Sequence, residues 1–217
     1  FKYKRKEDVF KLVNFKIKKG DKILIYGRSG AGKSTFFDLI TGLLIPQKGS
    51  IYIDQEKLDN LEILMAWHKN IAYVPQKPFA FKDTLFQNLS LSNKGFSPSL
   101  KAKAIKSLKF ADLLPASFDL LNFQDLLDFQ IDENGSNLSG GQLQRLSIAR
   151  AIFSGRKVIL LDEPTSAIDE KSSKKIMNNF LNLDMNYTVL IITHNTNHTN
   201  LLKHRKLLIK DKSIVEI

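Results

Sequence analysis

Short, continuous apolar runs alternate along the chain with stretches whose apolar positions recur every three or four residues. The runs within 157–164 and 187–194 indicate strands that are buried on both faces of a sheet. A third strand is expected at 22–26, followed by a glycine-rich turn and a helical pattern over 33–44. This alternation predicts an α/β domain with a mostly parallel sheet.

The rest of the chain adds an antiparallel β part and a helical insertion. Strands are expected at 49–54 and 70–76, and the runs 206–210 and 213–217 predict a terminal hairpin. Between Asp83 and Asn137 helical patterns dominate, as in 98–114, where Pro98 suits a first helical turn. We therefore expect one domain over 1–217, with a core of 1–82 and 140–217 and an inserted helical subdomain of about 83–139.

Composition narrows the class of protein. Of the 217 residues, 43% are hydrophobic and 25% charged, which is enough for an ordinary globular core. The chain has no cysteine, so it has no disulfide and no thiolate metal site. No apolar run approaches the roughly 20 residues that cross a bilayer, and no signal peptide is apparent.

The net charge of +11 has two readings. It can indicate a nucleic-acid or anionic membrane partner, or it can reflect a lysine-rich composition spread along the whole chain. The lysines are scattered, with only short runs such as KYKRK and KHRK, which favours the second reading.

Residues 27–35, GRSGAGKST, fit the phosphate-loop pattern G-x-x-x-x-G-K-[ST] between a predicted strand and a predicted helix. Glycines let backbone N–H groups curl round phosphate oxygens, and the helix N-terminus adds positive potential. Lys33 is expected to reach the β- and γ-phosphates and Ser34 to ligate Mg²⁺. The predicted nucleotide-binding residues are Gly27, Arg28, Ser29, Gly30, Ala31, Gly32, Lys33, Ser34 and Thr35. The alternative, a glycine-rich turn without a ligand, does not explain the complete motif in this context.

Two acidic residues follow the apolar run at 158–161. A buried strand that ends in an acid places a carboxylate at the sheet edge where such folds bind ligands. We expect Asp162 to hold the Mg²⁺ shell through water, and Glu163 to polarise an attacking water. The alternative is a pair of solvated acids at a strand end.

A second glycine pair occurs in LSGGQ, residues 138–142, before a stretch that predicts a helix. A helix N-terminus preceded by small residues suits an anion, although Ser139 could also be a helix cap with nothing bound. Together with 27–35, the segments 73–76, 138–151, 158–169 and 190–194 resemble, in order and context, the motifs of ATP-binding-cassette (ABC) ATPases. The resemblance covers nearly the whole chain and implies a P-loop (RecA-like) core with ATP and Mg²⁺ as ligands.

The resemblance also implies a dimer, either of two copies or with a homologous cassette, in which two ATP molecules lie between the partners. In such a dimer Ser139, Gly140, Gly141 and Gln142 act on the nucleotide of the other copy. Tyr3 matches the aromatic residue that stacks on adenine, with Phe1 as a competing candidate. The remaining matches are Gln76, which contacts Mg²⁺ and the attacking water; His194, which contacts the γ-phosphate; and Asp169, in the loop that crosses between copies.

Three segments resemble exporters within this family. Glu133 precedes a glycine ahead of LSGGQ, residues 81–89 resemble a segment that docks on a membrane domain, and Phe1–Tyr3 match an exporter F-x-Y. We therefore expect a transmembrane domain upstream of residue 1, a location at the cytoplasmic face of the inner membrane, and no nucleic-acid partner. The alternatives are a soluble ABC ATPase that acts on DNA or the ribosome, and a non-hydrolysing regulatory cassette, against which the intact Glu163 argues. The sequence does not indicate the cargo.

Overall fold

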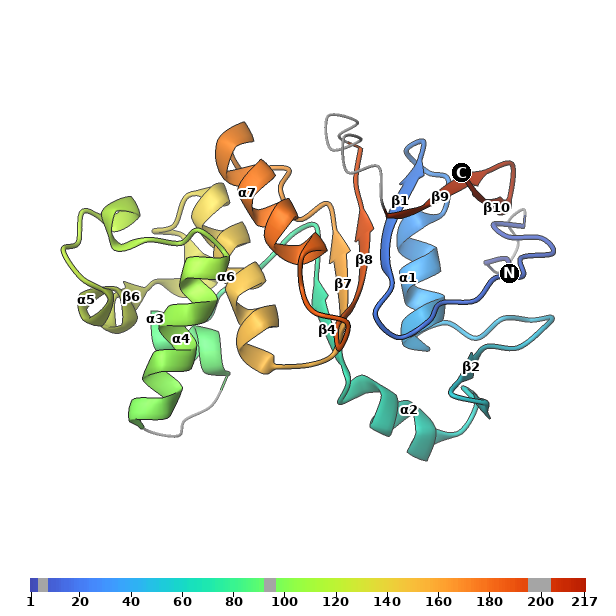
Figure 1. The fold of residues 1–217 in the computed structure, drawn as a ribbon, viewed down its shortest axis with the longest axis horizontal. Coiled ribbons are helices and arrows are strands. Elements are labelled where there is room, and N and C mark those ends of the chain that lie inside the picture. The colour runs from blue at the N-terminus through green and yellow to red at the C-terminus, as the bar shows by residue number, and fades with distance from the viewer. Residues whose placement is uncertain (4–7, 92–96, 195–203) are drawn as a thin grey trace. The chain divides into compact units, whose positions relative to one another are not determined.

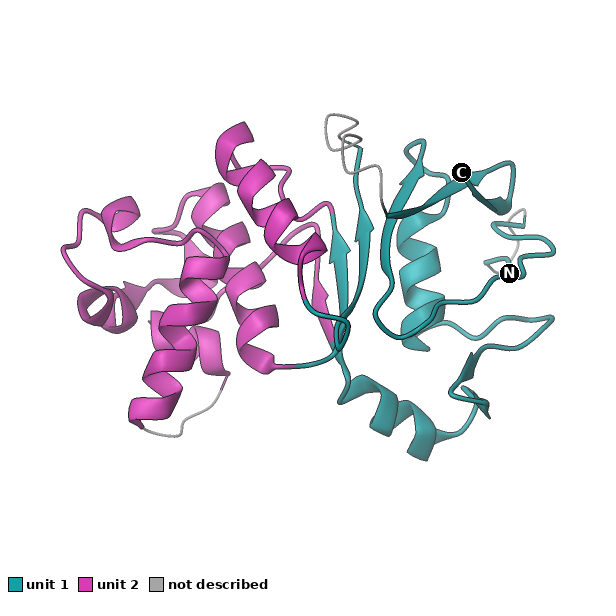
Figure 2. Ribbon diagram, in the orientation of Figure 1, with its two compact units in different colours: residues 1–71, 156–162, 184–217 teal, residues 72–155, 163–183 magenta. Residues whose placement is uncertain are grey.

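The computed structural model describes residues 1–3, 8–91, 97–194 and 204–217 (Figure 1). The chain forms two compact units (Figure 2). Unit 1 consists of residues 1–71, 156–162 and 184–217, and unit 2 of residues 72–155 and 163–183. The chain first passes from unit 1 to unit 2 within strand β4 (Ile71–Val74).

Unit 1 contains a mostly parallel sheet, as the apolar runs predict. Its strands lie in the order β10-β9-β1-β8-β7. Strands β9, β1, β8 and β7 are parallel, and β10 is antiparallel to β9. The predicted terminal hairpin is therefore confirmed. The strand bounds are β1 (Lys22–Gly27), β7 (Val158–Asp162), β8 (Thr188–Ile192), β9 (Arg205–Lys210) and β10 (Ser213–Glu216).

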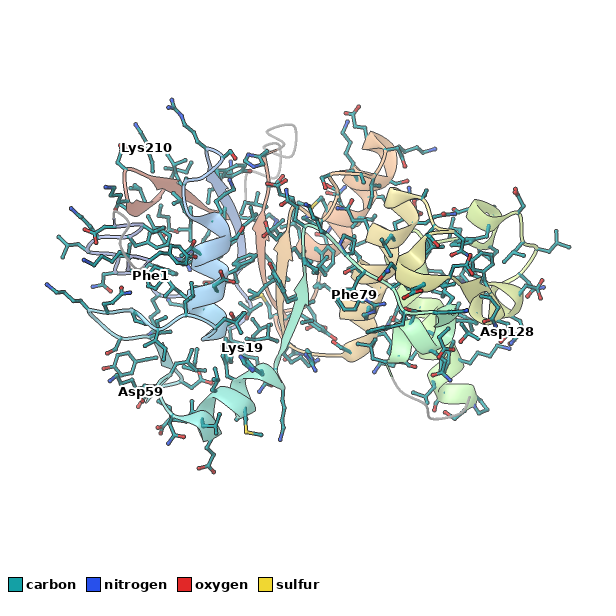
Figure 3. All side chains as sticks on the ribbon, turned by 180° about the vertical axis from the view of Figure 1, so that it is seen from behind. Phe1, Lys19, Asp59, Phe79, Asp128 and Lys210 are labelled. Carbon is teal, nitrogen blue, oxygen red and sulfur yellow. The ribbon has the colours of Figure 1, made fainter. Side chains whose placement is uncertain are left out.

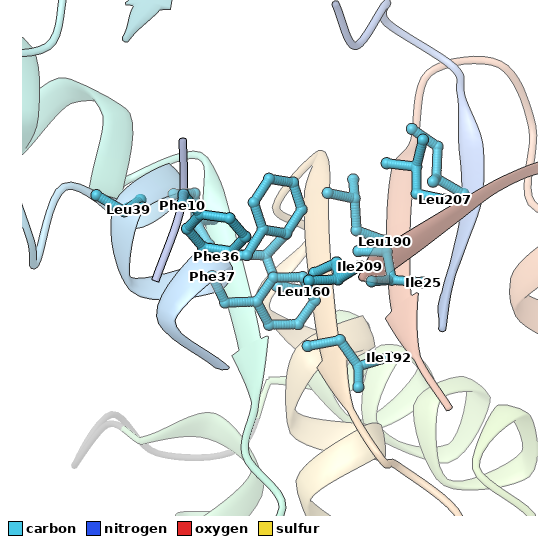
Figure 4. Packing of buried hydrophobic residues seen from close by; sticks show 12 residues of the cluster. Phe10, Ile25, Phe36, Phe37, Leu39, Leu160, Leu190, Ile192, Leu207 and Ile209 are labelled. Atoms are coloured by element: carbon cyan, nitrogen blue, oxygen red, sulfur yellow. The ribbon is translucent and has the colours of Figure 1, made fainter. Parts of the chain in front are cut away.

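Helix α1 (Lys33–Thr41) packs its phenylalanines on one face of this sheet (Figure 4). Phe36 and Phe37 lie in one buried cluster with Leu160 and Leu190 from the central strands. Each such side chain contributes roughly 1.5–3 kcal/mol by leaving water. The helix ends earlier than the predicted 44, because Gly42 adopts φ 75° and terminates it.

The remaining elements of unit 1 are short. Strand β2 (Tyr52–Ile53) pairs antiparallel with β3 (Glu56–Lys57), so the strand expected over 49–54 is only two residues long. The sharp turn between them accounts for this, since Asp54 and Gln55 both have positive φ. Helix α2 (Leu61–His68) follows, capped by the Asn60 side chain.

Unit 2 is mainly helical and contains the whole of the predicted helical segment 83–139, although the bounds of that subdomain stay a prediction. Helix α4 begins at Pro98 after the Ser97 cap and ends at Phe110 rather than 114. Strands β5 and β6, which precede α3 and follow α5 in the sequence, form a two-stranded antiparallel pair. The bounds are β5 (Asp83–Thr84), α3 (Leu85–Ser90), α4 (Pro98–Phe110), α5 (Phe123–Asp128), β6 (Gln130–Ile131), α6 (Gly140–Ser154) and α7 (Glu170–Leu181), with single 3₁₀ turns at Pro115–Phe118 and Glu133–Gly135.

Helix α7 belongs to unit 2 although the chain reaches it only after β7. Lys175 pairs with Asp112 at 2.6 Å, and the Asn179 amide donates to the Phe110 carbonyl at 2.9 Å. The Phe110 and Phe180 rings meet edge to face, with centroids 4.9 Å apart. These contacts join α7 to the end of α4.

Lys19 and Lys210, both labelled in Figure 3, are exposed charged residues of unit 1. Among the helices in the described ranges, none has both the length and the apolar composition needed to cross a membrane.

Candidate nucleotide site

The phosphate loop connects β1 to α1 in unit 1. The helix starts after Gly32, which adopts φ 100° and provides no side-chain cap, so its first backbone N–H groups receive no side-chain cap bond. The Lys33 ammonium donates to the Gly27 carbonyl at 3.0 Å and to the Arg28 carbonyl at 3.1 Å, and thus lies inside the curve of the loop. A buried cation beside a helix N-terminus is an environment that suits phosphate oxygens.

At two positions of this loop the surrounding atoms leave no room for a side chain, so glycine is required. A Cβ at Gly27 would lie 2.8 Å from the Ile209 carbonyl oxygen, and one at Gly32 would lie 2.6 Å from the Val9 side chain. At Gly30, in contrast, a Cβ would meet nothing within 4 Å. The tip of the loop at Gly30 is therefore open, whereas its two ends are closely packed.

The Ser34 hydroxyl donates a hydrogen bond to Asp162 Oδ2 at 3.1 Å. Asp162 is the last residue of β7 and is buried, while Ser34 lies in the first turn of α1. A hydroxyl beside a carboxylate is a hard-oxygen pair of the kind that holds Mg²⁺ together with water and phosphate oxygens. In the described part of the chain no three His, Asp or Glu side chains gather into a metal site.

His194 follows β8 at the same edge of the sheet. Ile192, two residues earlier, pairs with Asp162 of β7 on one side and with Ile25 of β1 on the other. The Thr193 backbone N–H donates to the Ile25 carbonyl at 3.2 Å and extends this pairing. Unit 1 therefore brings the phosphate loop, Asp162 and His194 to the carboxyl ends of neighbouring parallel strands.

Tyr3 contacts the phosphate-loop helix. Its hydroxyl lies 3.1 Å from Thr35 Oγ1, and its ring meets Phe1 edge to face at 5.1 Å between centroids. Tyr3 is 37% exposed. The geometry keeps both Tyr3 and Phe1 as candidates for an adenine contact.

Glu163 and Gln76 meet in unit 2. The Gln76 amide donates to Glu163 Oε2 at 2.9 Å. Glu163 has φ 50°, a left-handed conformation that non-glycine residues seldom adopt. It costs about 1–3 kcal/mol, which the surrounding contacts must offset for the conformation to persist. Such strain occurs often at functional sites.

The LSGGQ segment forms the N-terminus of α6 through a complete capping box. Ser139 Oγ accepts from the Gln142 backbone N–H at 3.1 Å, and Gln142 Oε1 accepts from the Ser139 N–H at 2.7 Å. The Gln142 amide also donates to the Ser117 carbonyl at 2.6 Å. Ser139 and Gly140 are exposed, so this helix terminus is presented to solvent while its cap is intact.

Asp169 is the N-cap of α7. Its Oδ1 accepts from the Ser172 N–H at 2.9 Å, and its Oδ2 accepts from Arg145 at 2.7 Å. These bonds, the one from the Ser172 backbone first, lower the pKa of the Asp169 carboxyl. The structure thus gives this residue a local role beside the predicted role in the crossing loop.

Gln144 and Arg145 make hydrogen bonds to the segment 163–169 that the sequence motifs did not indicate. Gln144 is buried and bonds the segment 163–167, and Arg145 bonds Asp169. The burial of Gln144 could have been predicted from the helical pattern, because Ile148 and Ala151, four and seven residues further on, are apolar and lie on the same buried face. An amide at such a position of a helix needs polar partners.

The predicted site residues thus fall into two groups. Unit 1 contains Tyr3, residues 27–35, Asp162 and His194, and unit 2 contains Gln76, residues 139–142, Glu163 and Asp169. The boundary between the units passes between the adjacent residues Asp162 and Glu163.

Comparisons with known proteins identify the family of this chain. The model of the ABC transporter family matches residues 10–166. The chain is 37% identical over 182 residues to the glutathione/L-cysteine transport system ATP-binding/permease protein CydC of Bacillus subtilis, and 37% identical over 182 residues to an ATP-dependent lipid A-core flippase of Aliivibrio fischeri. Each match covers 84% of this chain but 30% of the relative, so the chain spans less than a third of these proteins.

Solved structures show the same fold. A bacterial Atm1-family ABC exporter with ATP bound superposes with a TM-score of 0.83 at 26% identity, covering 99% of this chain and 36% of the exporter chain. An ATP-binding cassette, solved as a dimer in a post-hydrolysis state with ADP and Pi, gives 0.79 at 31% identity over 99% of this chain and 94% of that one. The chain therefore belongs to the ABC transporter family.

Proposed function

We propose that this chain is the ATP-hydrolysing domain of an ABC exporter. The observation that carries the proposal is the contact of Ser34 with Asp162 at the mouth of a glycine loop that curves round the Lys33 ammonium. The proposal is supported by the relatives, whose names describe ATP-binding/permease proteins and flippases.

The residues of unit 1 bind and orient the triphosphate in this proposal. Lys33 and the uncapped N–H groups of α1 stabilise charge on the β- and γ-phosphates. Ser34 and Asp162 would hold Mg²⁺, Asp162 through water. Bound Mg²⁺ would neutralise the charge that develops on the phosphate oxygens. His194, at the end of β8, donates to the γ-phosphate, and Tyr3 stacks on adenine.

The residues of unit 2 act on water. The Glu163 carboxylate orients the attacking water and accepts its proton as the water attacks the γ-phosphate in line. The Gln76 amide donates to Glu163 Oε2 at 2.9 Å and so helps to hold the direction of this carboxylate. Gln76 is also the proposed Mg²⁺ contact of this unit.

A second copy of the cassette completes the proposed assembly. Ser139, Gly140 and Gly141 form a helix N-terminus in which Ser139 and Gly140 are exposed. In the proposed assembly this terminus is an anion site for the γ-phosphate bound by the partner. Gln142 holds that terminus in shape, and Asp169 lies in the loop that would cross between copies. Loss of the shared γ-phosphate on hydrolysis would loosen the dimer.

The proposed place of the domain is the cytoplasmic face of a membrane, joined to a transmembrane domain. This rests on the exporter-like segments of the sequence and on relatives more than three times as long as the matched region. The competing function, a soluble ATPase that acts on nucleic acid, is supported only by the net charge of +11.

The experiment that tests the proposal replaces Glu163 by Gln in the 217-residue chain. Glu163→Gln should retain ATP affinity, lose roughly 10²–10⁴-fold in turnover, and accumulate as an ATP-bound dimer in light scattering. Glu170→Gln is the matched control, since Glu170 is an exposed acid in the same unit whose salt bridge is with Lys174. Normal turnover of Glu163→Gln would overturn the assigned role.

A further inference from the structure

Gln144, in the second turn of α6, bonds the segment that carries Glu163. Its side chain is 1% exposed, and both ends of its amide are used. Nε2 donates to the Glu163 carbonyl at 3.1 Å and to Ser166 Oγ at 2.9 Å, and Oε1 accepts from the Ala167 N–H at 2.9 Å. A single buried amide therefore spans the whole turn from 163 to 167.

The contact matters because the Glu163 backbone is held in an unfavourable conformation. Its φ of 50° persists only if neighbouring groups impose it. The Glu163 carbonyl receives two hydrogen bonds, from Gln144 at 3.1 Å and from the Ser166 backbone N–H at 3.3 Å. Of these two, the bond from Gln144 comes from outside the turn, so it ties the peptide plane to a rigid helix.

The first turn of α6 approaches the same segment closely. A Cβ at Gly141 would lie 2.9 Å from the Ala167 carbonyl oxygen, which leaves no room for a side chain. Gly141 belongs to the helix terminus that would receive the partner's phosphate. The helix terminus and the 163–167 turn are therefore in direct contact at two places, through Gly141 and through Gln144.

An apolar residue of similar length could fill the space of Gln144, but it would leave the Ala167 N–H and Ser166 hydroxyl without this partner. We propose that Gln144 is a positioning residue for ATP hydrolysis: it fixes the backbone of Glu163, and hence the direction of its carboxylate, relative to the signature helix. This inference rests on the proposed function, because it assumes that Glu163 acts on the attacking water.

The test compares Gln144→Met, which keeps the length of the side chain and removes its hydrogen bonds, with wild type. A misdirected carboxylate should lower kcat by roughly 10- to 100-fold while KM for ATP changes less than about twofold, since the phosphate loop is untouched. Asn179→Ala is the matched control, because it removes one amide bond to a backbone carbonyl elsewhere in unit 2. It should leave kcat and KM unchanged.

A double-mutant cycle separates positioning from general destabilisation. If Gln144 acts through Glu163, adding Gln144→Met to Glu163→Gln should reduce the residual turnover by less than about twofold. Hydrogen exchange adds a readout that does not depend on activity: the Ala167 amide should lose protection in Gln144→Met and keep it in Asn179→Ala.

The outcomes distinguish this inference from the proposed function. An inactive Glu163→Gln combined with a normal kcat for Gln144→Met would overturn the role of Gln144 alone. An additive loss in the double variant would also overturn it, since Gln144 would then act independently of Glu163. Normal turnover of Glu163→Gln would instead overturn the proposed function itself.

Discussion

Ser34 and Asp162 are 128 residues apart in the sequence, and their side chains meet at 3.1 Å. One residue is in the first turn of the phosphate-loop helix and the other ends a buried strand. Their contact is fixed by the register of the sheet in unit 1, where β7, β8 and β1 run parallel and end at one edge. The oxygen atoms proposed to hold Mg²⁺ are thus placed by the core packing and not by a flexible loop.

Replacing Ser34 should weaken Mg²⁺-dependent activity in a graded way. Ser34→Ala removes the hydroxyl that bonds Asp162 and is proposed to ligate Mg²⁺, and losing a group that supports a metal site should lower turnover roughly 10- to 100-fold. Ser34→Thr keeps the hydroxyl and should retain most activity. Steady-state hydrolysis over a range of Mg²⁺ concentrations measures both variants. Equal loss in the two would show that the hydroxyl is not the functional group.

The two glycines of the signature should respond differently to alanine. At Gly141 a Cβ would lie 2.9 Å from a backbone oxygen, so Gly141→Ala should destabilise the fold by about 1–3 kcal/mol. At Gly140 a Cβ would make only an ordinary contact of 3.6 Å with Ala167, so Gly140→Ala should unfold at nearly the wild-type temperature. Thermal unfolding followed by circular dichroism measures the difference. The reverse order of stability would contradict the packing described for α6.

Ser139 allows the helix cap to be separated from phosphate binding. Aspartate is as good an N-cap as serine, so Ser139→Asp should keep α6 stable, but its charge repels a phosphate. In the hydrolysis-deficient Glu163→Gln background, this variant should bind ATP and remain monomeric in light scattering. Tight ATP-dependent dimers of Ser139→Asp would refute the assignment of this terminus to the partner's nucleotide.

Asp169 should contribute to stability in a pH-dependent manner. Its pKa is lowered, first by the bond from the Ser172 backbone N–H, so the unfolded chain binds this proton more tightly than the folded chain. The contribution is therefore present above the unfolded pKa of about 3.9 and is lost as the pH falls through the lower folded pKa.

The variant Asp169→Asn retains a cap acceptor and does not titrate. On going from about pH 5 to about pH 3, it should lose less in Tm than wild type does, because only wild type has this carboxyl to protonate. Glu170→Gln, at the neighbouring exposed position, provides the control for a general loss of charge. Identical acid shifts of wild type and Asp169→Asn would contradict the capping role.

The strands and the phosphate loop could be predicted because their signals are local. The continuous apolar runs that become β7 and β8 are unambiguous, and the glycine-lysine motif lies between a strand and a helix as its chemistry requires. The ends of the helices were harder to predict. Helix α1 ends at Thr41 and α4 ends at Phe110, where backbone caps override an apolar pattern that continues.

The contacts of Gln144 and Arg145 could not be predicted, because each depends on a turn that lies about twenty residues further along the chain. Their partners are a backbone carbonyl, a backbone N–H, a serine hydroxyl and a capping carboxylate, and the two backbone groups have no side-chain signature. The left-handed backbone conformation of Glu163 could not be predicted from the sequence either, since glutamate favours conformations with negative φ. Functional residues that act through hydrogen bonds to distant backbone groups can be identified only from the structure.

The interleaving of the two units has a consequence for how the protein is made. Unit 2 is completed by α7, whose Lys175, Asn179 and Phe180 cover the end of α4, and unit 1 is completed only by β9 and β10. As the chain leaves the ribosome, neither unit can close before the segment that follows β7 has emerged. Nascent chains truncated after Gly155 should therefore leave the Phe110 ring without its Phe180 contact and bind chaperones, whereas chains that include residue 181 should already form that contact.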